Sequence, residues 1–120
     1  MADRFALSQV GKPYAYGAAG PSAYDCSGLV YRAWRAVGVA LPRVAAQQYT
    51  SGPHVPLDRL QPGDLLFWAR DPHNPATIYH VAMYTGFGAV VHAPHPGARV
   101  TVMAVHDWFP TVPVATRPRS

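Results

Sequence analysis

The sequence predicts an α+β domain, because helical hydrophobic spacing dominates its first half and strand-like spacing its second half. Apolar residues three or four positions apart mark residues 26–37 as an amphipathic helix. From residue 65 onward, short β-branched and aromatic runs alternate with turns rich in Gly and Pro. The 120 residues contain no repeat and no linker-like stretch. We therefore expect a single domain over residues 1–120, with N-terminal helices packed on an antiparallel sheet of about five strands.

Three segments of the first half are predicted to be helical. Residues 3–10 form the first, with Asp3 as the N-cap. Residues 26–37 form the second, and Gly38 follows it as a typical residue just past a helix end. Residues 44–49 form a short third helix, after which Ser, Gly and Pro break the pattern.

The second half is predicted to form an antiparallel meander. Tight turns rich in Gly and Pro separate its short strands, as expected when consecutive strands pair with each other. The predicted strands are residues 65–68, 78–85, 89–92, 99–103 and 112–116.

Composition narrows the classes of function. One cysteine rules out an intrachain disulfide and a zinc site made of four cysteines. The formal charge of +4 favours polyanions, but the basic residues are scattered and include one lysine, so we expect no nucleic-acid binding. An acidic polymer such as a cell wall fits this charge. No apolar run approaches the roughly 18 residues of a membrane span. No signal peptide is visible, so the N-terminus fits a boundary within a longer secreted protein.

Cys26 is the first candidate functional residue. It stands at the start of the predicted helix, after a Gly-, Pro- and Tyr-rich loop over residues 11–24. Helix dipoles stabilise negative charge at that end, so we expect a lowered thiol pKa and a reactive thiolate. The alternative is a buried cysteine that packs as a small hydrophobe. The polar or permissive neighbours Asp25, Ser27 and Gly28 favour the reactive interpretation.

A cysteine nucleophile needs a base, and two of the six histidines suit that role. His80 and His92 lie on the two strands of one predicted hairpin, joined by Gly86–Gly88. A three-residue loop of this kind places residue 92 opposite residue 82 and makes the two histidines diagonal neighbours on one face. At that reach their rings can form a hydrogen bond. A two-residue loop would instead turn His92 to the other face.

The histidines also invite a metal interpretation. His92 and His95 are three residues apart, but a proline lies between them and no further ligand set accompanies them. His54 and His73 stand among loop prolines and are expected to be solvated. We therefore expect neither a metal nor another cofactor.

These residues, taken together, resemble the NlpC-type (p-sixty) cysteine peptidases, which hydrolyse bacterial cell-wall peptides. The resemblance runs from about Gly11 to Val102, and Tyr16 and Ala18 depart from it, where the family usually has tryptophan and often a second glycine. Each matching segment is short, but their order is specific. The segments are Gly11–Gly17, Asp25–Val30, Gly38, Leu41–Arg43, Gln47 or Gln48, Leu60–Phe67, His80–Gly86 and Val91–Pro94.

The resemblance implies a papain-like α+β fold and a catalytic triad. Cys26 would be the nucleophile, His80 its base, and His92 the residue that orients His80. The backbone N–H of Cys26 and the hydroxyl of Tyr14 would be donors to the oxyanion. The implied substrate is a peptidoglycan stem peptide, cut between D-glutamate and a diamino acid such as meso-diaminopimelate.

By the same resemblance, Asp25 and Ser27 would flank the free amine of the stem peptide. A simple helix-capping role for Asp25 is the alternative. The protein is expected to be secreted or cell-wall associated and to act as a monomer. Three other functions stay open: an amidase or acyltransferase on this scaffold, an inactive domain that binds cell-wall peptides, and a toxin effector with the same chemistry.

Overall fold

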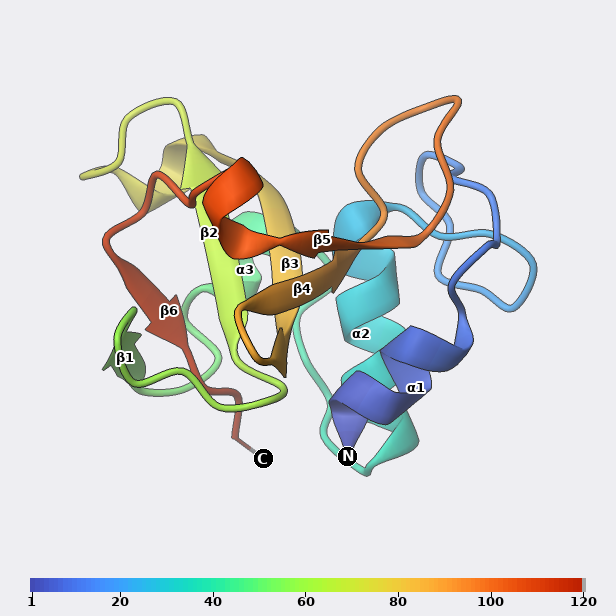
Figure 1. The fold of residues 1–120 in the computed structure, drawn as a ribbon, viewed down its shortest axis with the longest axis horizontal. Coiled ribbons are helices and arrows are strands. Elements are labelled where there is room, and N and C mark those ends of the chain that lie inside the picture. Colours follow the sequence, from blue (N-terminus) through green and yellow to red (C-terminus); the bar gives the residue numbers. More distant parts are fainter. Residues whose placement is uncertain (120) are drawn as a thin grey trace.

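A computed structural model describes residues 1–119 of the chain (Figure 1). The three helices are α1 (Ala2–Ser8), α2 (Cys26–Ala36) and α3 (Ala45–Gln48). Two short 3-10 turns are η1 (Pro75–Thr77) and η2 (Val105–Asp107). Within residues 1–119, no helix combines the length and apolar character needed to cross a membrane.

Six antiparallel strands form one sheet in the order β1-β6-β2-β3-β4-β5. The predicted meander is present from β2 to β5, and β6 returns to pair with β2 at the other side of it. The strands are β1 (His54–Pro56), β2 (Leu65–Ala69), β3 (Ile78–Gly86), β4 (Ala89–His92), β5 (Thr101–Ala104) and β6 (Val114–Thr116).

The strand count exceeds the sequence-based expectation by one, because β1 has no strand-like pattern. It has three residues, ends at Pro56 and directly follows Pro53. Proline lacks the N–H of a ladder donor and is tolerated at sheet edges. β1 is such an edge strand, with β6 as its partner.

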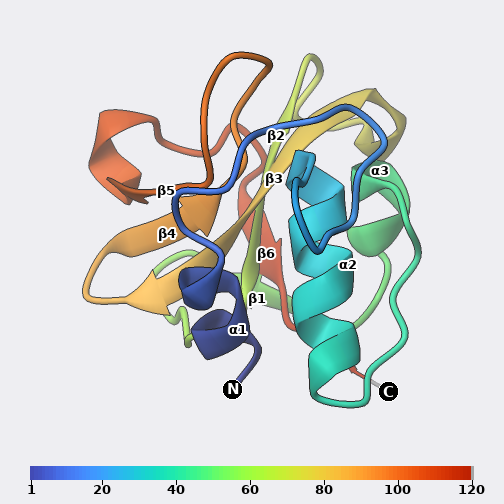
Figure 2. The ribbon, with the colours of Figure 1, turned by 90° about the vertical axis from the view of Figure 1, so that its right-hand side faces the viewer.

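The sheet has two covered faces, and α1 and α2 lie against one of them (Figure 2). The main core between sheet and helices includes Leu29 and Ala33 of α2 together with Phe67 and Met83 of the sheet. Neighbouring residues along the same strands point to the opposite face, where they build a second apolar cluster. The buried members of that cluster are Leu66, Trp68, Ala82 and Val90.

Helix α2 begins and ends where the sequence predicts. Asp25 is its N-cap, and the carboxylate accepts the N–H of Gly28 at 2.7 Å. At the other end, Gly38 has a φ of +88° and the N–H of Val39 donates to the carbonyl of Trp34 at 3.0 Å. This is the 6→1 bond of a glycine-terminated helix. Side-chain and backbone bonds therefore fix both ends of α2, and Cys26 is the first residue of this helix.

Helix α1 starts one residue earlier than predicted. Its N-cap position is Met1, and Asp3 lies in the first turn. The carboxylate of Asp3 accepts a hydrogen bond from the N-terminal ammonium group of Met1 at 2.7 Å. The prediction of Asp3 as the N-cap is wrong because its side chain binds that charged donor and caps no backbone N–H.

Candidate active site

Cys26 lies in a cavity of about 450 Å³ at the N-terminus of α2. Four segments converge there: the loop before α2, the first turn of α2, residues 43–46, and the start of β3. Polar and aromatic side chains supply half of the lining residues. They are Tyr14, Tyr16, Asp25, Ser27, Arg43 and Tyr79.

The thiol of Cys26 contacts the strand that carries His80. The backbone N–H of Val81, the residue after His80, donates a hydrogen bond to the sulfur. This contact places the sulfur next to β3, one residue after His80. The predicted neighbourhood of helix start and histidine strand is therefore present.

The expected lowering of the thiol pKa is wrong. Burial raises the pKa of Cys26, and the negative charge of Asp25 adds to the rise. Hydrogen bonds from the backbone N–H groups of Val81, Ser27 and Cys26 oppose the rise without reversing it. The helix N-terminus does supply donors to the sulfur, but loss of water around the thiol has the larger effect. Cys26 is consequently a neutral thiol at neutral pH.

The β3–β4 hairpin places both histidines on one face of the sheet. Met83 pairs with Val91. In an antiparallel ladder this register puts Ala82 opposite His92, as the sequence predicts, and makes His80 the diagonal neighbour of His92.

The turn that produces this register differs from the predicted one. Gly86, rather than Thr85, pairs with Ala89, so the loop has two residues. Both loop residues are left-handed, with φ of 54° at Phe87 and 74° at Gly88. Thr85 is an extra residue in β3, a bulge that shifts the register by one. Loop and bulge together have the same effect on His92 as the predicted three-residue loop.

His80 and His92 form the predicted ring-to-ring hydrogen bond. Nε2 of His80 lies 2.9 Å from Nδ1 of His92. Both side chains are buried, with 3% of each residue exposed. Burial lowers the pKa of His80 to about 3, helped by the positive charges of His92 and His95. Burial also lowers the pKa of His92 to about 4, with a smaller effect of His95. Both rings are neutral at neutral pH.

Two tryptophans that sequence reasoning did not single out enclose the histidine pair. Trp108 stacks on His80 with ring centroids 5.0 Å apart and an interplanar angle of 23°. Trp68, on β2 opposite His80, lies 5.1 Å from the same ring. The two indoles contact each other at 4.7 Å. The register of β2 and β3 could have indicated Trp68, whereas Trp108 follows η2 and no sequence signal links it to His80.

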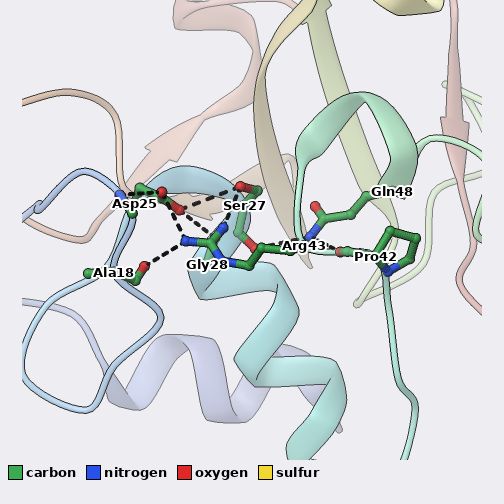
Figure 3. A network of polar contacts seen from close by, with 8 residues as sticks. Ala18, Asp25, Ser27, Gly28, Pro42, Arg43 and Gln48 are labelled. Atoms are coloured by element: carbon green, nitrogen blue, oxygen red, sulfur yellow. Dashed lines mark hydrogen bonds and ion pairs between the residues drawn. The ribbon is translucent and has the colours of Figure 1, made fainter.

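Arg43 was also missed as a site residue, although the segment Leu41–Arg43 carries part of the family resemblance. Its guanidinium donates to the Oγ of Ser27 at 2.9 Å and to the Oδ2 of Asp25 at 3.0 Å (Figure 3). A third bond, of 3.3 Å, reaches the carbonyl of Ala18. Arg43 thereby joins the first turn of α2 to the loop in front of it.

Comparison with known proteins shows the family to which the chain belongs. The model of the NlpC/P60 family matches residues 11–115. The chain belongs to the NlpC/P60 family. A γ-D-glutamyl-L-lysine dipeptidyl-peptidase of Bacillus subtilis is 38% identical over 98 residues, which are 82% of this chain and 33% of that protein. A probable endopeptidase of Mycobacterium tuberculosis is 42% identical over 105 residues, 88% of this chain and 26% of the relative.

Solved NlpC/P60 structures share the fold. The NlpC/p60 domain of the peptidoglycan hydrolase SagA superposes with a TM-score of 0.85 at 32% identity, covering 96% of this chain and 94% of that one. The peptidoglycan hydrolase RipB of Mycobacterium tuberculosis gives 0.83 at 36% identity, with 99% and 64% coverage. The predicted α+β, papain-like fold is confirmed. The chain spans about a third or less of the two curated relatives.

In this NlpC/P60 domain, the carboxylate of Asp25 is already fully engaged. It accepts the N–H groups of Gly28 at 2.7 Å and of Gly17 at 2.9 Å, besides the bond from Arg43. The capping role that sequence analysis left as the alternative is thus what the structure shows. The charge of Asp25 has a cationic partner within the protein, so its presence before Cys26 requires no substrate amine.

A glycine and a glutamine complete the packing around the first turn of α2. A Cβ at Gly28 would collide with the carbonyl oxygen of Ala18, so only glycine allows the loop to approach this closely. Gln48, fully buried in α3, donates to the carbonyls of Ser27 at 3.0 Å and Pro42 at 2.9 Å. Of the two glutamines that matched the family, Gln48 is the one that binds this turn.

Tyr14 lines the cavity together with Cys26. Burial raises the pKa of Tyr14, and the negative charges that Cys26 and Asp25 can carry raise it further. Its hydroxyl therefore keeps its proton at neutral pH and can donate a hydrogen bond. Its part in binding an oxyanion stays a prediction.

His54, His73 and His95 take no part in the hydrogen bond between His80 and His92. His54 is exposed on β1 and stacks on Tyr49 at 4.3 Å. His73 is exposed in the loop before η1. The Nδ1 of His95 contacts the carbonyl of Pro96 at 2.9 Å. Residues 1–119 contain no cluster of three or more His, Cys, Asp or Glu side chains suited to a metal ion.

Proposed function

We propose that this NlpC/P60 domain is a cysteine endopeptidase that hydrolyses peptidoglycan stem peptides. The scissile bond we propose joins the γ-carboxyl of D-glutamate to a diamino acid such as meso-diaminopimelate. Support comes from the relatives, which are named as endopeptidases or peptidoglycan hydrolases, and one of which is named for a γ-D-glutamyl-L-lysine substrate. Since the substrate is a wall polymer, we propose a secreted or wall-associated monomer.

The observation that carries this proposal is the position of Cys26 beside the strand that carries a hydrogen-bonded histidine pair. Cys26 opens α2 inside the cavity, and its sulfur contacts the backbone of β3 at Val81. His80 is the preceding residue of that strand, and His92 is hydrogen-bonded to it at 2.9 Å. A nucleophile beside a base that a third group orients is the arrangement of covalent acyl transfer.

The hydrogen bond between the rings defines the proton positions that catalysis requires. To accept a proton from the thiol, His80 must have an unprotonated Nδ1, so its own proton belongs on Nε2. That Nε2–H then donates to Nδ1 of His92, and His92 carries its proton on Nε2. This arrangement leaves Nδ1 of His80 as the basic nitrogen and keeps the ring from rotating.

The low pKa values of both histidines and the raised pKa of the thiol mean that the reaction starts from a neutral thiol and a neutral histidine pair. Because His80 is then a weak base, proton transfer must accompany attack of the sulfur on the carbonyl carbon. As the sulfur attacks the carbonyl carbon, its proton passes to Nδ1 of His80. The tetrahedral oxyanion accepts hydrogen bonds from the N–H of Cys26 and the hydroxyl of Tyr14. Collapse breaks the C–N bond, the amine leaves with the proton from His80, and a thioester forms. Water then hydrolyses the thioester by the same proton route.

A digestion of defined muropeptides tests the function. Purified domain is incubated with free L-Ala-γ-D-Glu-diaminopimelate and with the same peptide attached to glycan through an amide bond at its L-Ala. The products are identified by mass spectrometry. We expect the free diamino acid and L-Ala-D-Glu from the wild type and intact peptide from Cys26→Ala. A wild-type domain that binds the peptide but releases no product would indicate a non-catalytic binding domain. Release at another amide bond would reject the proposed bond and retain the cysteine chemistry.

A further inference from the structure

The histidine pair is separated from solvent by a residue that no motif contains. His80 and His92 are each 3% exposed, whereas Trp108 is half-buried. Trp108 stacks on His80 at 5.0 Å and lies 6.1 Å from His92. Trp68, which is fully buried, lies 5.1 Å from the His80 ring and 4.7 Å from the Trp108 ring, so the three rings form a triangle. Trp108 is therefore the partly exposed member of this group, and Trp68 is the buried one.

The position of Trp108 depends on a segment remote from the motifs. Its N–H donates to the carbonyl of Val105 at 3.2 Å, and the N–H of Val105 donates to the carbonyl of Gly88 at 2.8 Å. Gly88 belongs to the β3–β4 turn. The hairpin that carries both histidines thus also anchors the 3-10 turn that places Trp108 over them.

We propose that Trp108 is a positioning residue for the proposed reaction: it holds the ring plane of His80 and excludes water from the His80–His92 pair. The inference rests on the proposed function for its catalytic meaning, while the burial of the pair is independent of any substrate. Trp108 does not line the cavity that contains Cys26 and contacts the His80 ring, so it acts through His80.

Several ionisable groups surround the pair and must be separated from the effect of Trp108. Cys26 lies on α2, and His95 follows β4 and lowers the pKa of both buried histidines through its charge. His106 and Asp107, on η2 beside Trp108, are exposed and lie 3.2 Å from each other. For both buried rings, loss of water is the larger cause of the lowered pKa. Removal of Trp108, which changes this burial, should therefore alter the histidine pKa values more than removal of a nearby charge does.

The test compares Trp108→Ala, Trp108→Phe and Phe109→Ala, the last being an exposed neighbour outside the stack. Histidine Cε1–H signals are titrated by NMR, with His80→Gln used for assignment. We expect the apparent pKa of His80 to rise from about 3 by at least about one unit toward its ordinary value in Trp108→Ala. Trp108→Phe and Phe109→Ala should stay within about half a unit of the wild type. His95→Gln should raise it by less than Trp108→Ala.

The kinetic arm uses the same variants. Misplacement of the base should lower kcat of Trp108→Ala about tenfold or more with KM unchanged, and Trp108→Phe should retain most of the rate. A folded Trp108→Ala with wild-type titration of His80 would overturn the proposal, whatever its activity. If the wild type cleaves no stem peptide, the proposed function fails and the titration still decides the role of Trp108. If the alanine variant does not fold, Trp108→Leu, which cannot stack, replaces it.

Discussion

The candidate site has two halves of different chemical character, a polar half around Cys26 and a buried half around His80 and His92. Around Cys26, a carboxylate, a guanidinium, a hydroxyl and backbone N–H groups form a hydrogen-bonded network that lines an open cavity. Around His80 and His92, indole rings replace these polar groups, and both imidazoles are almost completely buried. Cys26 is thus positioned by directional bonds, and the histidine pair is positioned mainly by packing.

This difference has an electrostatic consequence. Polar bonds fix the α2 N-terminus at the wall of a cavity that Cys26 lines. Aromatic packing removes water from the imidazoles and lowers their pKa values to about 3 and about 4. Both imidazoles therefore stay neutral far below neutral pH, and the thiol is neutral as well. The predictions below break one half at a time.

The largest effect is expected from removing the reacting groups themselves. Cys26→Ala should abolish hydrolysis, and His80→Ala should lower kcat/KM by roughly 10²–10⁴-fold, because it removes the proton acceptor. His92→Ala should cost less, since it removes only the orienting partner. His92→Asn and His92→Gln should recover part of the rate, because an amide oxygen can accept the Nε2–H of His80. Steady-state kinetics on the stem peptide measure this order, and full activity of His92→Ala would remove the third member of the triad.

The buried half should also make the fold sensitive to acid. In the unfolded chain a histidine binds a proton near its ordinary pKa of 6.5, whereas folded His80 and His92 bind one only near about 3 and about 4. Between these values the unfolded state holds more protons, so the free energy of unfolding must fall as pH falls. The stability that the neutral pair contributes is complete above pH 6.5 and is lost progressively toward pH 3.

We expect a total loss on the order of 8 kcal/mol over that range, since the two pKa values together lie about six units below the ordinary value and one unit corresponds to about 1.4 kcal/mol. Urea unfolding at pH 7.5, 6, 5 and 4 measures it. The matched control is the double variant His80→Gln, His92→Gln, which should have a flatter profile over the same range. Parallel profiles for the wild type and the double variant would mean that other groups cause the acid sensitivity.

The sequence predicted the parts of the site that depend on local signals. An amphipathic stretch that starts at Cys26 and ends before Gly38 was enough to define α2. Alternation on both strands of a hairpin was enough to pair His80 with His92. The loop and the bulge at Thr85 were not predictable separately, but their effects cancel in the register. Local pattern therefore gave the right pairing from an incorrect turn.

What the sequence did not predict depends on segments that meet only after folding. Arg43 reaches Asp25 and Ser27 from the segment between α2 and α3, and Trp108 reaches His80 from beyond β5. The thiol pKa failed for the same reason. A helix N-terminus can be read from sequence, but the burial that outweighs it requires the packed structure. β1 was missed because its three residues have no strand-like pattern and are defined as a strand only by pairing with β6.

In the polar half, Asp25→Ala should lower the free energy of unfolding by about 1–2 kcal/mol, because it removes the N-cap of α2 and the anionic partner of Arg43. Asp25→Asn is the matched variant. Asparagine also caps helices well and keeps the bond from Gly28, but its NH2 replaces the oxygen that accepts from Gly17 and Arg43. The ion pair and the Gly17 bond are therefore both lost, and the cost should be about 1 kcal/mol.

Chemical unfolding measures both variants, and rates on free and N-acetylated stem peptides are compared alongside. The structure favours a structural role for Asp25, so acetylation of the amine should affect the wild type and Asp25→Asn alike. An Asp25→Asn variant that is fully stable and has lost a wild-type preference for the free amine would instead support the substrate-docking role that the family resemblance implies.

The smallest expected effect concerns the reactivity of the thiol, and it separates the two halves most directly. If polar bonds at the α2 N-terminus governed the sulfur, iodoacetamide would alkylate Cys26 rapidly at pH 6–7. Because burial raises the thiol pKa from 9.0, we expect a rate at pH 7 no higher than that of N-acetylcysteine, and a further increase above pH 8 as thiolate forms. Mass spectrometry of intact protein gives the rates, and the single cysteine makes every adduct an adduct of Cys26. His80→Ala should change the profile little, since a neutral imidazole holds no charge to stabilise a thiolate. A fast rate that is already constant below pH 7 and collapses in His80→Ala would show a thiolate–imidazolium pair, and would mean that the polar half controls the charge of the site.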